Sequence, residues 1–184
     1  MPIAIQRKGT QFSIIPRGDS VFKEGDDAFF ITLKEGVEDI YELTGNIKTP
    51  INNVMILGGG RIALNTAKKL SENKIKVSLI ELNKEKAIEL ADKLSDVMVI
   101  HGDGRNLELL EEENLNSMDA FISVTGDSET NIMSCLMANS KKIKKTIALV
   151  ENMDYFKLSH SIGIDNLINK KLLAANKILR YIRK

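Results

Sequence analysis

From about residue 52 onward, short apolar runs alternate with segments whose apolar residues recur at three- and four-residue spacing. Near-continuous apolar runs are typical of strands in a parallel sheet that is covered on both faces, and the three- and four-residue spacing predicts helices. This alternation predicts an α/β fold, a Rossmann-like doubly wound parallel sheet whose right-handed crossovers place helices on both faces. The predicted strands are NVMILG (53–58), KVSLI (76–80), DVMVI (96–100), DAFISV (119–124), KTIALV (145–150) and NLIN (166–169).

Several of the predicted helices have an apolar face that can be read directly from the sequence. A helix has 3.6 residues per turn, so apolar residues at this spacing lie on one face. That face is predicted to pack against the rest of the protein. Its members are Ala87, Ala91 and Leu94 in one helix, Ile132, Met133, Leu136 and Met137 in a second, and Leu172, Ala175, Leu179 and Ile182 in a third.

The first fifty residues have a different pattern. Apolar runs at 12–15 and 28–33 are separated by turn-forming residues and predict short strands, and EGVEDIYELTG (35–45) predicts a short helix that ends near Gly45. With no more than three short strands, this β-rich α+β fragment is smaller than most segments that fold alone. We place the boundary between the two parts within residues 46–51, which include Pro50.

Composition narrows the class of protein. The 184 residues carry 26 basic and 25 acidic side chains and no Trp, so neither net charge nor base stacking favours a nucleic-acid partner. The single cysteine, Cys135, suits a reducing compartment. No apolar run approaches the roughly 18 to 20 residues that a membrane helix needs, and the opening MPIAIQRKGTQF lacks the apolar core of a signal peptide. We therefore expect a cytoplasmic protein.

The end of the first predicted strand of the α/β part carries the pattern G-x-G-x-x-A, formed by Gly58, Gly60 and Ala63. The first glycine of such a motif permits a sharp turn, and the second lets the main chain approach a pyrophosphate. Ala63 keeps the first helical turn close to the sheet, and the helix N-terminus offers unpaired N–H groups to phosphates. Arg61, inside the turn, adds a candidate charge-assisted contact.

Glu81 ends the next predicted strand, 23 residues after Gly58. A separation of roughly 20 residues is expected for the carboxylate that binds ribose hydroxyls in a dinucleotide site. An acidic group there repels a 2′-phosphate and disfavours NADP. These residues do not separate NAD(H) from ADP or ATP, which carry the same adenosine. The alternative is a tight strand–helix turn with a solvated Glu81.

The ends of later strands supply further candidates. Asp103, between Gly102 and Gly104, is either an acceptor for an adenosine group or an Asx-type turn residue. The Thr125 and Gly126 backbone is expected to line the cleft, and Asp127 or Ser128 to cap the following helix. The predicted cofactor-binding set is Gly58, Gly60, Arg61, Ile62, Ala63, Glu81, Leu82, Gly102, Asp103, Thr125 and Gly126.

Catalytic patterns are missing from this sequence. Hydride transfer needs an acid or base at the nicotinamide end, and the two histidines, His101 and His160, are expected to be structural. No Cys/His cluster has the spacing of a zinc site, and no Lys-Ser or Lys-Thr closes the glycine turn as in a Walker motif. We therefore predict a site that holds a nucleotide without converting it.

Taken together, these motifs carry a family resemblance. The segments NNVMILGGGRIALNTAKKL, VIHGDGRN, FISVTGDSETN and GIDNLINKKLLAANKILRYIR occur in this order. They are similar to the KTN domain, also called the RCK N-terminal domain, of the TrkA family of cytoplasmic regulatory subunits of Trk-type potassium uptake systems. The stretch IQRKGTQFSIIPRGDSVFKEGDDAFFI resembles the end of an RCK C-terminal (TrkA-C) subdomain.

The resemblance implies a domain organisation and a role. Residues 1–47 are expected to be part of an RCK C-terminal subdomain and residues 52–184 a complete RCK N-terminal domain, so that the chain is a piece of a duplicated protein. The role is nucleotide-dependent gating of a potassium-translocating membrane subunit, as a homo-oligomer at the inner face of the membrane. The helix from about Lys170 to Arg183 is expected to form dimer contacts. Leu149 departs from the family, where this position is often basic.

The resemblance also assigns roles within the nucleotide site. Gly58, Gly60 and Arg61 are expected to face phosphates, Glu81 the ribose and Asp103 the adenosine. NAD(H) is the expected cofactor, with ADP or ATP as alternatives at the same site. Two other functions remain open, a dehydrogenase-type oxidoreductase that lacks its catalytic domain and a degenerate Rossmann scaffold used only for assembly.

Overall fold

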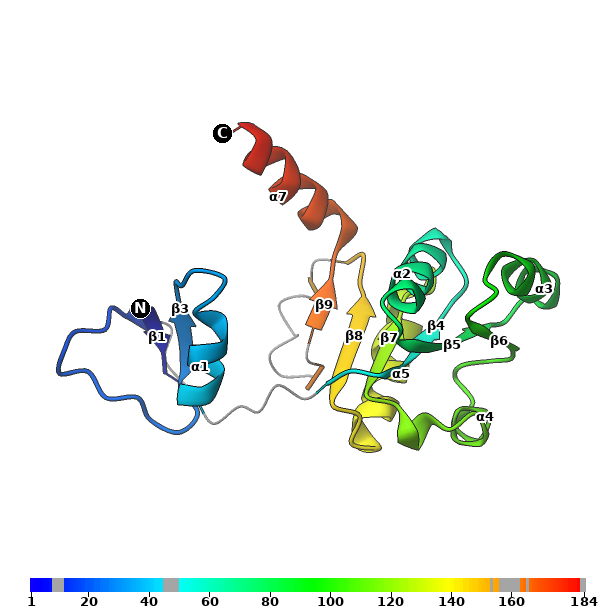
Figure 1. The fold of residues 1–184 in the computed structure, drawn as a ribbon, viewed down its shortest axis with the longest axis horizontal. Helices are drawn as coiled ribbons and strands as arrows, with labels where there is room; N and C mark the ends of the chain where they lie inside the picture. The colour runs from blue at the N-terminus through cyan, green and yellow to red at the C-terminus, as the bar shows by residue number, and fades with distance from the viewer. Residues whose placement is uncertain (8–11, 45–49, 153, 156–162, 165, 183–184) are drawn as a thin grey trace. The chain divides into compact units, whose positions relative to one another are not determined.

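The chain forms two units, Met1–Thr49 and Pro50–Lys184 (Figure 1). The structure is a computed structural model and describes residues 1–7, 12–44, 50–152, 154–155, 163–164 and 166–182. The point of division falls within the boundary segment that the sequence predicts. None of the helices in these described ranges has the length and apolar character that crossing a membrane requires.

The first unit is a small antiparallel sheet followed by a helix. Its strands pair in the order β2-β1-β3. Among the described residues of this unit, Ile5 alone is a buried apolar side chain, so the core that they form is small. The elements are β1 (Pro2–Gln6), β2 (Ser13–Ile14), β3 (Asp27–Phe30) and α1 (Val37–Leu43).

The second unit contains a 6-stranded sheet in the order β6-β5-β4-β7-β8-β9, and every neighbouring pair of strands is parallel. The strand order reverses between β4 and β7, as it does in a dinucleotide-binding Rossmann sheet. This confirms the predicted fold class. The strands are β4 (Asn53–Leu57), β5 (Lys76–Glu81), β6 (Met98–His101), β7 (Ala120–Ser123), β8 (Lys145–Leu149) and β9 (Asn166–Ile168).

Helices cover both faces of this sheet because alternate residues of its strands point to opposite sides. In β4, Val54 and Ile56 join one apolar cluster with the buried residues of α2 and α3, while Met55 and Leu57 join another with those of α4, η1 and α5. The helical elements are α2 (Arg61–Glu72), α3 (Lys84–Lys93), α4 (Leu107–Glu112), η1 (Leu115–Ser117), α5 (Ser128–Ser140) and α7 (Lys170–Ile182).

Details of the predicted apolar faces need correction. In α3, Leu90 is buried and Ala91 is exposed, because the strip that meets the sheet runs through Ala87 and Leu90 to Leu94. In α5, Met133 is exposed. In α7 no described residue is buried, and the helix leads away from the end of β9 (Figure 1), so its apolar face stays exposed and its predicted role in dimer contacts stays a prediction.

One buried side chain anchors the beginning of α7. The Nδ2 atom of Asn169 donates hydrogen bonds to the carbonyl oxygens of Val150 (2.9 Å) and Glu151 (3.1 Å) at the end of β8. Its Oδ1 atom accepts hydrogen bonds from two N–H groups in the first turn of the helix, those of Lys171 (2.9 Å) and Leu172 (3.1 Å). The orientation of the start of α7 is therefore tied to the carboxyl edge of the sheet.

Candidate nucleotide site

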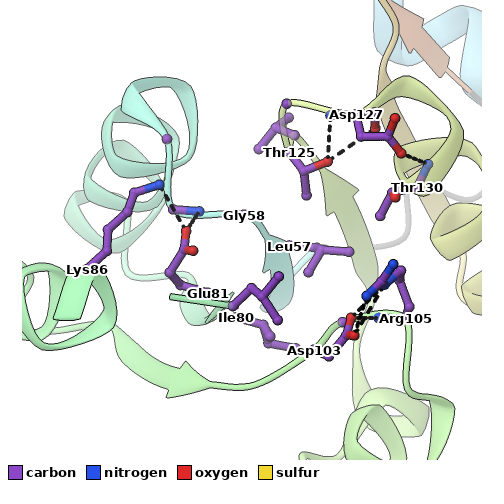
Figure 2. A pocket seen from close by; sticks show the side chains of 16 residues that line it. Leu57, Gly58, Ile80, Glu81, Lys86, Asp103, Arg105, Thr125, Asp127 and Thr130 are labelled. Carbon is purple, nitrogen blue, oxygen red and sulfur yellow. Dashed lines mark hydrogen bonds and ion pairs between the residues drawn. The ribbon is translucent and has the colours of Figure 1, made fainter. Parts of the chain in front are cut away.

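A cavity of about 580 Å³ opens at the carboxyl ends of the central strands, next to the point where the strand order reverses (Figure 2). Ligands of open α/β sheets collect at this position. The residues that line the cavity come from the last positions of β4 and β5, from the loops after β4, β5, β6 and β7, and from the first turns of α3 and α5. They are Leu57, Gly58, Gly59, Gly60, Ile80, Glu81, Leu82, Lys86, Asp103, Gly104, Arg105, Val124, Thr125, Gly126, Asp127 and Thr130.

The glycine turn has the conformation that its motif predicts. Gly58 has φ +99°, a left-handed backbone that favours glycine. Gly60 is the N-cap of α2, and a Cβ atom placed on it would have no heavy atom within 4 Å. Gly60 lines the cavity at the N-terminus of α2, where a helix offers the unpaired N–H groups that can bind phosphates.

The Glu81 carboxylate holds the main chain of this turn in place. Its Oε2 atom accepts a hydrogen bond from the Gly59 N–H (2.7 Å) and forms an ion pair with Lys86 Nζ (3.1 Å). Its Oε1 atom accepts a hydrogen bond from the Asn83 N–H (2.9 Å), next to the start of α3. The carboxylate therefore ties together the two loops at which the ribose and the pyrophosphate are expected.

These contacts also determine the charge of Glu81. Burial is the largest single influence and raises the pKa of this carboxyl, but the hydrogen bonds from Asn83, Lys86 and Gly59 together outweigh burial. The net effect is a pKa below the ordinary value, so the group is a carboxylate at neutral pH. A buried anion with a free acceptor position suits a ribose hydroxyl.

Asp103 both forms a turn and lines the cavity. Its Oδ1 atom accepts a hydrogen bond from the Arg105 N–H (3.0 Å), which is the Asx-type turn that the sequence left as an alternative. Its Oδ2 atom pairs with Arg105 Nη2 at 2.7 Å. The guanidinium holds the pKa of Asp103 below its usual range, and the pair places one positive and one negative group on the cavity wall (Figure 2).

The loop after β7 is held by a buried amide. The Oδ1 atom of Asn131 accepts hydrogen bonds from Ser123 Oγ (2.9 Å) and from the Thr125 N–H (2.9 Å) and hydroxyl (2.7 Å). Its Nδ2 atom donates to the carbonyl oxygens of Thr125 (3.3 Å) and Leu149 (2.8 Å). The Thr125 loop is therefore fixed to the ends of β7 and β8 before any ligand arrives.

The structure brings most of the predicted residues together, though not all of them. Those that line the cavity are Gly58, Gly60, Glu81, Leu82, Asp103, Thr125 and Gly126. Arg61 and Ile62 are exposed on α2, Ala63 is fully buried under it, and Gly102 packs beside Leu109, so these four do not line the cavity. The burial of Ala63 agrees with its predicted role of keeping the helix close to the sheet.

The other residues singled out in the sequence are Asp127, the two histidines and Leu149. Asp127 is the N-cap of α5, and its side chain accepts a hydrogen bond from the Thr130 N–H (2.7 Å). His101 is exposed at the end of β6 and does not line the cavity, and His160 lies outside the described residues. Leu149 is 3% exposed and belongs to the core. Within the described part of the chain, no group of three or more His, Cys, Asp or Glu side chains is arranged to hold a metal ion.

Several polar residues of the cavity are not among those predicted from the sequence. Lys86 and Arg105 supply its cations, and Thr130 comes from the first turn of α5. Lys86 follows Glu81 by five residues and approaches it only because α3 begins at Lys84 and places Lys86 in its first turn. The signal that could have found it is the Asn83 N-cap, which fixes where that helix starts.

Comparison with known proteins identifies the family. The model of the TrkA-N domain matches residues 54–170, which cover the whole cavity. The chain belongs to the TrkA-N domain family. A TrkA-N domain is a nucleotide-binding Rossmann domain, in agreement with the position of the cavity.

Relatives of known name are TrkA proteins. The chain is 35% identical over 171 residues to the Trk system potassium uptake protein TrkA of Haemophilus influenzae, covering 93% of this chain and 37% of that protein. It is 33% identical over 181 residues to the protein of the same name from Vibrio alginolyticus, covering 98% of this chain and 39% of that protein. The chain thus spans about two fifths of the length of these relatives.

Solved structures share the fold. The TrkA-N domain of the inner membrane protein ybaL from Escherichia coli superposes with a TM-score of 0.64 at 18% identity, over 73% of this chain and 98% of that chain. The RCK domain of GsuK superposes with a TM-score of 0.61 at 20% identity, over 97% of this chain and 37% of that chain. A GsuK channel structure bound to NAD has a TM-score of 0.56 at 17% identity, over 66% and 22% of the two chains.

Proposed function

We propose that this chain is the nucleotide-sensing part of a regulatory subunit that gates a potassium uptake transporter. The observation that carries the proposal is the cavity between the glycine turn at the start of α2 and the ionised Glu81, at the reversal point of the sheet. The TrkA relatives, named as potassium uptake proteins, support a regulatory role without catalysis.

The ligand that fits this cavity best is an adenine nucleotide, with NAD(H) first and ADP or ATP as alternatives. The N-terminus of α2 suits a pyrophosphate, and the carboxylate of Glu81 suits a ribose hydroxyl while repelling a 2′-phosphate. One GsuK structure is bound to NAD and another to ADP, which supports the same ligand class for a site on this fold.

Gating requires that the nucleotide bind one conformation better than another, because equal affinity for both would shift no equilibrium. We propose that the chain acts as a homo-oligomer beneath a Trk-type potassium-translocating membrane subunit, at the cytoplasmic face of the membrane. The exposed apolar face of α7 supplies a surface for the contact between subunits. Residues 1–47 serve as part of an RCK C-terminal subdomain, and residues 52–184 as the RCK N-terminal domain.

The experiment is a calorimetric titration of the chain with NADH, NAD, ADP, ATP and NADP, repeated on Gly60→Ala. A methyl group at this position fits the unliganded structure, since nothing lies within 4 Å of it, but it occupies the space that a phosphate needs. The matched control is Gly18→Ala, where a Cβ atom also meets nothing within 4 Å and which does not line the cavity.

We expect micromolar binding of the adenine nucleotides to the native chain and to Gly18→Ala, with affinity reduced at least about tenfold in Gly60→Ala. Equal affinity in all three proteins would place the ligand elsewhere. Absence of binding by every nucleotide would overturn the sensor function and leave a scaffold for assembly. Oxidation of NADH by an added substrate would instead support the oxidoreductase alternative.

A further inference from the structure

Lys86 forms an ion pair with Glu81, the carboxylate that is expected to bind the ribose. Its Nζ atom lies 3.1 Å from Glu81 Oε2, and in Figure 2 the two side chains point toward one another at the cavity wall. The Lys86 side chain is 45% exposed while that of Glu81 is 9% exposed. The ammonium group is therefore the solvent-accessible partner of a buried anion.

Hydrogen-bond capacity limits what Glu81 can still accept. A carboxylate has about four acceptor positions, two on each oxygen. The Oε2 atom accepts from the Gly59 N–H and pairs with Lys86, so both of its positions are in use. The Oε1 atom accepts from the Asn83 N–H. The contacts made by the described residues therefore leave about one position for a ligand.

A ribose 2′,3′-diol presents two hydroxyl donors, so a bidentate contact with Glu81 needs a second position to be vacated. The Gly59 and Asn83 N–H groups are main-chain donors, one in the glycine turn and the other next to the start of α3. Moving either would change the backbone. Lys86 has a long flexible side chain at the solvent edge, so its contact is the one that can be given up.

We propose that Lys86 tunes how strongly the site discriminates between a hydroxyl and a phosphate at the ribose 2′ position. Against a 2′-hydroxyl, the ammonium group competes with the ligand for Glu81. Next to a 2′-phosphate, the same group is a cation within reach of the added negative charge. Lys86 therefore weakens the preference for NAD(H) over NADP(H) that Glu81 alone would give. This inference rests on the proposed nucleotide function.

The test measures dissociation constants for NADH and NADPH with the native chain, Lys86→Met and Lys93→Met. Methionine keeps an aliphatic stem of similar length and removes the charge. Lys93 lies on the same helix, pairs with the carboxylate of Glu89 and does not line the cavity, so its variant matches the change in net charge. Lys86→Arg, which keeps the charge, serves as the conservative variant.

We expect the ratio of the NADPH to the NADH dissociation constant to rise by about tenfold in Lys86→Met, with tighter NADH binding and weaker NADPH binding. Lys93→Met and Lys86→Arg should keep the native ratio within about twofold. Thermal unfolding of each protein checks that it remains folded.

The measurements distinguish a failure of the role proposed for Lys86 from a failure of the proposed nucleotide function. If NADH binds with an unchanged ratio in folded Lys86→Met, the role of Lys86 is overturned and the nucleotide function stands. If neither nucleotide binds the native chain or any variant, the nucleotide function is overturned and the role of Lys86 falls with it. A folded Lys86→Met that loses NADH binding would show that Lys86 holds the nucleotide and does not compete with it.

Discussion

A Cβ atom built on Gly58 would lie 3.0 Å from the main-chain nitrogen of Thr125. The two residues follow β4 and β7, neighbouring strands on either side of the reversal in strand order. The loops that they begin therefore touch at the level of the backbone, and the absence of a side chain at Gly58 permits that contact. The shape of the central part of the cavity depends on this approach.

Gly58→Ala should lower the free energy of unfolding by about 2 kcal/mol, because alanine is strained at φ +99° and its methyl group meets the Thr125 backbone. Urea denaturation measures the change. Gly126→Ala is the matched control in the same cavity, where a Cβ atom meets nothing within 4 Å. A loss of stability as large in the control as in Gly58→Ala would show that the close approach has no special cost.

Asn131→Ala should cost about 2 to 3 kcal/mol of stability, because it leaves the Ser123 hydroxyl and the Leu149 carbonyl without the partner that the buried amide supplies. The Thr125 loop also loses three hydrogen bonds to Asn131. The loss should appear in chemical denaturation and as faster amide exchange in this loop.

The control for this variant is Asn65→Ala on the exposed side of α2, which should change stability by less than about 0.5 kcal/mol. Similar losses in the two variants would mean that the Asn131 network contributes little to stability.

Asp119 should make the free energy of unfolding of the chain depend on pH in the acidic range. Hydrogen bonds from the Asn52 N–H, Lys144 and the Asn53 N–H lower the pKa of this carboxyl from 3.8 to about 2. A depressed native pKa contributes stability that is fully present above 3.8 and is lost as pH falls through about 2. Asp119→Asn should therefore be less stable at neutral pH by about 1 kcal/mol, after allowance for solvent screening.

The stability gap between the native chain and Asp119→Asn should narrow as pH falls from 3.8 toward 2, as followed by urea denaturation at a series of pH values. Asp92→Asn, which removes an exposed carboxylate on α3, controls for the change in net charge. A gap that stays constant over this range would contradict the assigned role of Asp119.

Glu81→Gln should destabilise the site even though the side chain keeps its size. An amide has one oxygen, so either the Gly59 N–H or the Asn83 N–H would face an NH₂ group. We expect a loss of about 1 to 3 kcal/mol, measured by urea denaturation at neutral pH.

The pH dependence of the stability of Glu81→Gln provides a second test. Because the native pKa of Glu81 lies below 4.5, its stabilising effect is present above 4.5 and disappears as pH falls through the native pKa. The difference between the native chain and Glu81→Gln should shrink in that window. A variant as stable as the native chain at neutral pH would show that the two main-chain bonds contribute little.

The sheet could be predicted from the sequence because its strands are short apolar runs, and those at its centre are buried on both faces, as Val54 and Met55 of β4 are. The glycine turn and Glu81 were also readable, since backbone demands and strand ends leave local signals. Lys86 and Arg105 were not, because each reaches the cavity through the geometry of the segment that follows its strand. The dimer contacts expected of α7 stay a prediction, since an apolar stripe does not identify the surface that covers it.

The side chain of Asn169 makes α7 an arm whose base is attached next to the end of β8. Its amide binds the main chain after β8 on one side and N–H groups in the first turn of α7 on the other, so the direction of the helix is tied to the edge of the sheet. Thirteen residues at 1.5 Å each make the arm about 20 Å long. A tilt of about 5° at this base carries the far end, near Ile182, through roughly 1.7 Å, which is large compared with the tolerance of a packed contact. Small displacements at the edge of the sheet are therefore magnified at a distance.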